Sequence, residues 1–117
     1  MDNNFDEHGY IYCFSNPSFD GILKVGITRR DPRVYAEELS TIGVPTPFVV
    51  EFAKRVKSPE YNERNVNDKL DEFGYRVDKY RAYFRCDKSV IFRIFGTFNG
   101  TWYKTAPQKP LLNTCLL

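Results

Sequence analysis

Hydrophobic and polar positions alternate in two stretches near the start of the chain, and each stretch predicts a β-strand. Along residues 9–15 one face carries Tyr10, Tyr12 and Phe14, and the other carries Ile11 and Cys13. Along residues 22–28 one face carries Leu23, Val25 and Ile27, and the other carries Lys24, Gly26 and Thr28. Turn-forming residues fill positions 16–21, so the two strands are close enough to form a hairpin. Residues 48–56 are apolar and β-branched, which predicts a third strand.

Capping residues and apolar spacing predict three helices. The first begins with Asp31 as its N-cap and Pro32 as its first residue, and it ends at Gly43. Its expected buried stripe is Tyr35, Leu39 and Ile42. The second helix runs from Pro59 to Phe73, and the third covers residues 87–95. Residues 75–85 predict a loop and a short strand, and periodicity is lost after residue 96.

The second predicted helix carries a carboxylate on its apolar face. The inward stripe of this helix is formed by Val66, Leu70 and Phe73, and Glu63 and Asn67 project from the same side. An inward carboxylate is costly unless a cation or a hydrogen-bond donor meets it. Two interpretations stay open: Glu63 lies at an edge, where it reaches solvent or pairs with an arginine, or it belongs to a functional site.

Length and composition fit one globular domain. The chain has 117 residues, of which 42% are hydrophobic and 27% charged. No apolar run approaches the roughly 20 residues that cross a bilayer, so we expect no membrane partner. Residues 1–9 are acidic and polar, unlike a secretory signal or a transit peptide, so we expect a cytoplasmic protein, or a nuclear one in a eukaryote. We expect a flexible start at 1–8, a domain at 9–96 and an extended tail at 97–117 that docks along the body or pairs with a second copy.

Several kinds of chemistry are excluded by residue counts. Three widely spaced cysteines and a single histidine form neither a zinc pattern nor a Ser-His-Asp or Cys-His constellation. The net charge is +2, but cations gather at Lys24, Arg29, Arg30 and Arg33. This segment is either a solvated basic turn or a surface that faces phosphates. Tyrosines, a basic segment and one inward glutamate together fit phosphodiester hydrolysis, in which a carboxylate holds a divalent ion and cations neutralise the phosphate.

An ordered series of short motifs resembles the phage- and virus-type subfamily of the GIY-YIG nucleases. The series comprises Gly-Tyr-Ile-Tyr at 9–12, Ser-Asn-Pro at 15–17, Lys-Val-Gly-Ile-Thr at 24–28, Asp-Pro at 31–32, Glu-Leu-Ser at 38–40 and Gly-Val-Pro-Thr-Pro-Phe at 43–48. A helix that contains a glutamate and the segment 81–84 follow in the expected order, so the resemblance covers about residues 9–92. It implies an α+β fold in which helices flank a small three-stranded antiparallel sheet.

The resemblance also implies roles for individual residues. Tyr12 matches the tyrosine that polarises or deprotonates the attacking water, and Lys24 stands where the second motif usually has tyrosine. Glu63 matches the glutamate that binds Mg²⁺ or Mn²⁺. Phosphate contacts are expected from Lys24, Arg29, Arg30 and Arg33, and Arg30 or Arg33 would also act in catalysis. The implied activity is metal-dependent endonucleolytic cleavage of nucleic acid, with DNA as the expected substrate.

Three positions depart from the subfamily pattern. Tyr35 stands where the first helix normally supplies an arginine, Asn67 replaces a histidine, and Ala82 replaces a glutamate. These departures favour an alternative, in which a catalytically inactive protein of the same fold binds nucleic acid or inhibits a partner protein. For a protein of phage or viral origin, which the resemblance implies, we expect the cytoplasm of the host cell.

Overall fold

The computed structural model describes residues 7–40, 45–78 and 81–104. Its elements, in chain order, are β1 (Gly9–Ser15), β2 (Ile22–Thr28), α1 (Pro32–Leu39), β3 (Val49–Val56), α2 (Pro59–Glu72), β4 (Tyr83–Arg85), α3 (Lys88–Phe95) and β5 (Thr101–Trp102). Within these ranges no helix has the length and apolar character needed to cross a membrane. The expected start at 1–8 lies mostly outside the described residues, as do residues 105–117 of the expected tail and any dimer contact made through them.

The sheet has five strands, in the order β4-β2-β1-β3-β5, and every neighbouring pair is antiparallel. The mixed α+β architecture and the β1–β2 hairpin agree with the sequence, but the expected number of three strands is wrong. β4 has three residues and lies where the sequence predicted a short strand within 75–85, whereas β5 has only two residues, too few for an alternating pattern to be visible. β5 pairs with Lys54 and Arg55 of β3, so residues beyond position 96 contribute to the sheet.

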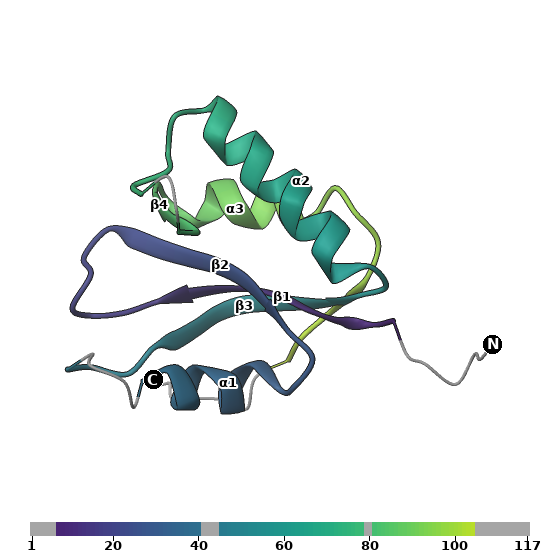
Figure 1. Cartoon of the computed structure of the whole chain (residues 1–117), viewed down its shortest axis with the longest axis horizontal. Coiled ribbons are helices and arrows are strands. Elements are labelled where there is room, and N and C mark those ends of the chain that lie inside the picture. Colours follow the sequence, from purple (N-terminus) through teal and green to yellow (C-terminus); the bar gives the residue numbers. More distant parts are fainter. Residues whose placement is uncertain (1–6, 41–44, 79–80, 105–117) are drawn as a thin grey trace, which may run out of the picture.

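Helices cover both faces of the sheet (Figure 1): α2 and α3 lie on one face and α1 on the other. The larger core, on the α2–α3 face, is formed by Ile11, Cys13, Leu23, Val25, Val56, Val66, Leu70, Phe84, Ile91 and Phe95. The smaller core, on the α1 face, is formed by Tyr12, Phe14, Ala36 and Ala53. Alternate residues of β1 therefore enter two separate cores, as the alternation along residues 9–15 predicted.

The first helix is shorter than predicted. Its start is confirmed, because the Asp31 side chain accepts hydrogen bonds from the backbone N–H groups of Arg33 and Val34. The helix ends at Leu39, because the Ser40 hydroxyl donates to the Ala36 carbonyl and accepts from the N–H of Phe48. The expected stripe through Ile42, like the expected end at Gly43, falls in residues 41–44, outside the described ranges.

One expected core residue of the second helix is exposed. Val66 and Leu70 are buried as predicted, but Phe73 is 52% exposed, so its assignment to the inward stripe is wrong. Phe73 is the C-cap of α2, where the chain turns towards Gly74, and its ring contacts Tyr75 instead of the core. The i, i+7 spacing from Val66 therefore does not predict burial of Phe73, because α2 ends at Glu72, one residue before the predicted end.

A buried lysine ties β3 to the end of α3. Lys54 is only 4% exposed, and its Nζ donates to the Phe95 carbonyl at 2.8 Å and to the Phe98 carbonyl. The same Nζ lies 4.7 Å from the ring centroid of Trp102, which is a cation–π contact. Through these contacts, Lys54 of β3 binds the last carbonyl of α3 and a carbonyl in the segment that follows it, and it packs on Trp102 of β5.

We expect Lys54→Met to lower the free energy of unfolding by about 1–3 kcal/mol, because two partly or fully buried carbonyls would lose their donor. Methionine keeps most of the apolar length, so the loss reports the ammonium group itself. Urea denaturation followed by tryptophan fluorescence measures the effect, with Lys57→Met, at the exposed position just after β3, as the control. A variant as stable as the wild type would show that the hydrogen bonds of the Lys54 ammonium group do not stabilise the fold.

Candidate functional site

The Tyr12 side chain lies directly over Gly26 of the neighbouring strand. The two residues are cross-strand partners in the β1–β2 pair. A Cβ atom added at Gly26 would overlap the Tyr12 hydroxyl oxygen and would lie 2.6 Å from Tyr12 Cζ. Glycine is therefore required at position 26 for the Tyr12 ring to lie against β2 with its hydroxyl over Gly26.

The Tyr12 phenol is protonated near neutral pH. Burial, the nearby Tyr35 and Glu63, and a side-chain hydrogen bond with Tyr35 all raise the pKa of Tyr12 above its ordinary value of 10.0. The ring also stacks on Phe14 with centroids 3.8 Å apart, which fixes its orientation. In this environment Tyr12 acts as a hydrogen-bonding hydroxyl, not as a preformed phenolate.

Glu63 and Lys24 influence each other across the gap between α2 and β2. Burial raises the pKa of the Glu63 carboxyl, and the charge of Lys24 opposes that rise. Burial lowers the pKa of Lys24, and Glu63 opposes that change in turn. Lys24 Nζ also lies 5.2 Å from the ring centroid of Tyr83, its partner on β4. Among the residues that the structure describes, none donates a hydrogen bond to the Glu63 carboxylate.

An unpartnered amide oxygen lies one helical turn after Glu63. Asn67 Oδ1 is buried and has no hydrogen-bond partner in the described part of the chain. Those same ranges contain no cluster of three His, Cys, Asp or Glu side chains that would enclose a metal ion. Mg²⁺ favours oxygen ligands and usually keeps several waters, so it needs only one or two protein groups beside the substrate phosphate. Glu63 and Asn67 fit such an ion.

The basic segment is already paired with carboxylates. Arg29 forms a two-point ion pair with Glu60 of α2 (2.6 and 3.2 Å), and Arg30 forms one with Glu38 of α1. The Arg30 guanidinium carbon also lies 6.0 Å from the ring centroid of Tyr35, the residue that hydrogen-bonds to Tyr12.

Arg33 is separated from this group. It lines a hollow between α1 and the start of β3, together with Ala36, Phe48 and Val49. The structure thus couples Tyr12, Tyr35, Lys24 and Glu63 electrostatically, with Arg30 beside Tyr35 and Arg29 paired with α2.

The residues that sequence analysis undervalued are Gly26, Asn67 and Tyr83. The sequence marks Gly26 only as part of a motif, and it marks Asn67 as an inward residue and a departure from the subfamily pattern, not as a ligand. Ala82 packs against the larger core and its carbonyl accepts a hydrogen bond from the N–H of Val25 at 3.0 Å. A short side chain at position 82 therefore suits its apolar surroundings.

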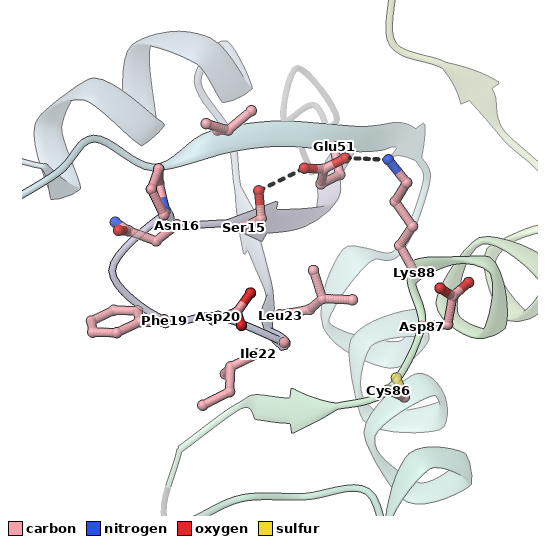
Figure 2. A pocket seen from close by; sticks show the side chains of 13 residues that line it. Ser15, Asn16, Phe19, Asp20, Ile22, Leu23, Glu51, Cys86, Asp87 and Lys88 are labelled. Atoms are coloured by element: carbon pink, nitrogen blue, oxygen red, sulfur yellow. Dashed lines mark hydrogen bonds and ion pairs between the residues drawn. The ribbon is translucent and has the colours of Figure 1, made fainter.

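A separate hollow of about 410 Å³ lies beside the β1–β2 turn and the start of α3. Ser15 Oγ donates to Glu51 at 2.6 Å and Lys88 Nζ donates to the other oxygen of Glu51 at 2.8 Å (Figure 2). Burial alone would raise the pKa of Glu51. The two donors outweigh this effect, so the pKa of Glu51 falls below its ordinary value. Lys88 thus compensates the charge of Glu51, while Asp20 and Asp87 leave the lining acidic, and none of the predicted site residues lines it.

Comparison with known families adds a match that covers the whole site. Residues 9–99 match the T5orf172 domain. The chain belongs to the T5orf172 domain family. Searches of curated proteins and of solved structures gave no significant match. T5orf172 domains are associated with nuclease-type phage proteins, and the matched residues of this T5orf172 domain include Tyr12, Gly26 and Glu63.

Proposed function

We propose that this T5orf172 domain is a GIY-YIG-type endonuclease that uses Mg²⁺ or Mn²⁺ to hydrolyse phosphodiester bonds in nucleic acid, with DNA as its substrate. The observation that carries the proposal is the position of Glu63. Its partly buried carboxylate accepts no hydrogen bond from the described residues, and it lies one turn from the unpartnered Asn67 oxygen. Such a carboxylate is costly to maintain unless a cation completes it.

The side chains around Glu63 divide the work of phosphodiester hydrolysis. Glu63 and Asn67 would hold the ion, which supplies a positive charge to the developing oxyanion. Lys24, opposite Glu63, would neutralise a non-bridging phosphate oxygen. The hydrogen-bonded hydroxyls of Tyr12 and Tyr35 would hold and orient the attacking water.

Arg30 would take the phosphate contact that Tyr35 cannot make, because tyrosine carries no charge. Its ion pair with Glu38 is exposed at the surface, with side-chain exposures of 60% and 43%. Exposed ion pairs are worth only about 0–1 kcal/mol, so a phosphate can replace the carboxylate at little cost.

An inactive nucleic-acid-binding protein of the same fold is the second candidate. The observations that favour it are the uncharged Tyr35 at the arginine position and the engagement of Arg30 by Glu38. This candidate keeps the basic surface and predicts binding without cleavage.

We expect plasmid and single-stranded DNA to be cut in Mg²⁺ or Mn²⁺ and to stay intact in EDTA. Gel electrophoresis of both substrates over a time course measures the reaction. A protein that retards DNA in a gel but cuts neither substrate with any divalent ion would contradict the nuclease and support the second candidate.

A further inference from the structure

An aromatic hollow of about 220 Å³ lies next to the proposed site. It is lined by Phe19, Ile22, Val77, Asp78, Arg81 and Tyr83. The rings of Phe19 and Tyr83 meet edge to face, with centroids 6.2 Å apart and planes at 83°. Pockets for drug-sized ligands measure roughly 300–1,000 Å³, so this hollow suits a smaller, fragment-sized group.

Tyr83 lines the hollow and also contacts Lys24 of the proposed site. Tyr83 pairs directly with Lys24 across β2 and β4, and its ring lies 5.2 Å from Lys24 Nζ. A group that enters the hollow against Tyr83 is therefore adjacent to Lys24, whose charge acts on Glu63. Ile22 and Lys24 are two residues apart on β2 and point to the same face of the sheet, so the hollow continues the surface of the site along the strand.

The charges around this hollow fit an anion. Arg81 has 71% of its side chain exposed, and its pairing with Asp78 is loose, at 3.9 Å. Arg81 lines the hollow and Lys24 Nζ lies over the Tyr83 ring, so two cations border the aromatic wall. A phosphate bound by these two cations would place its attached group over the aromatic hollow.

We propose that the hollow holds one unstacked nucleobase of the substrate, next to the phosphate bound by Lys24. Aromatic side chains beside a positively charged phosphate contact are the combination that binds single-stranded nucleic acid. A base inside an intact duplex cannot leave its stack without cost, so the substrate class is single-stranded or locally unpaired nucleic acid. The inference rests on the proposed function, since it assigns a substrate to the same site.

Binding measured in Ca²⁺, as a substitute for Mg²⁺ that limits turnover, tests the base contact apart from cleavage. The probes are a labelled single-stranded oligonucleotide, its fully paired duplex and an abasic strand of the same length and charge, compared by fluorescence anisotropy. We expect the single strand to bind about tenfold or more tightly than the abasic strand, because stacking of a base on aromatic residues has that magnitude. The duplex should bind more weakly than the single strand.

Tyr83→Leu should remove the difference between the single and abasic strands, and Tyr83→Phe should keep it. Phe73→Leu, at the exposed aromatic end of α2, is the matched control and should leave the difference unchanged. Equal affinity of the wild type for the single and abasic strands would overturn the inference without any variant. If the protein binds the single strand more tightly than the abasic strand but cuts nothing in Mg²⁺, only the proposed function is overturned. If it cuts nucleic acid but binds the two strands equally, only the base contact is overturned. Absence of binding would overturn both.

Discussion

Replacing Glu63 by glutamine is expected to lower metal-dependent cleavage by more than about 100-fold. Loss of a group that only supports a metal ligand typically costs about 10–100-fold, and Glu63 is the proposed ligand itself. Glutamine keeps the shape of the side chain and removes its charge. Initial cleavage rates in saturating Mg²⁺ measure the effect, and Glu60→Gln on the same helix provides the matched control.

Glu60 is exposed and pairs with Arg29, so its loss should change cleavage much less than the loss of Glu63. A Glu63→Gln variant that cuts at the wild-type rate would contradict the metal assignment.

The stability of the folded domain provides a second measurement on Glu63. Burial raises the pKa of Glu63 above its ordinary value of 4.5, so the wild type loses stability as pH rises from 4.5 through the raised pKa. Glu63→Gln escapes this loss and should be as stable as the wild type, or slightly more stable, at neutral pH without metal.

Gly26→Val should both destabilise the domain and abolish cleavage. The nearest obstacles to a Cβ at this position are the hydroxyl oxygen and Cζ of Tyr12, which belong to a buried and stacked ring. Overpacking of this kind costs about 1–3 kcal/mol, and the ring can move aside only by leaving Phe14 and Tyr35. Thermal unfolding and the cleavage assay measure the two effects.

Gly96→Ala is the appropriate control for that substitution. Gly96 is exposed, has φ of −72°, and the nearest atom to an added Cβ is a backbone oxygen at 3.3 Å. Its alanine variant should therefore unfold and cut much like the wild type. If Gly26→Val retained full stability, the close approach of the Tyr12 ring to β2 would be wrong.

The sequence predicted those parts of the fold in which one residue pattern persists over a whole element. Alternation predicted β1 and β2, an apolar and β-branched run predicted β3, and capping residues with apolar spacing predicted the helices. β4 was expected only as a short strand, and β5 was missed, because two residues cannot display a period. β5 is held by partners distant in sequence: Trp102 contacts Phe52, Phe92 and Phe95, and its strand pairs beside Lys54.

The site was less predictable than the fold. Helical spacing showed that Glu63 points inward, but not that Lys24 comes close enough to influence its pKa, since the two residues are distant in sequence and are brought together by the packing of α2 on the sheet. Charge counting suggested four cations for phosphate binding. The structure shows Arg29 and Arg30 in ion pairs and Arg33 on the far side of α1, which depends on side-chain orientation and on carboxylates from other elements.

The division of β1 between two cores has a consequence for the precision of the site. A slip of β1 by one residue would send Tyr12 towards α2 and α3, and would bring Ile11 or Cys13 to the α1 face. Both cores would be lost together, so the register is enforced twice over. The Tyr12 hydroxyl thus occupies its place through the alignment of the entire central strand, and changes in loop length around the sheet can accumulate without shifting it.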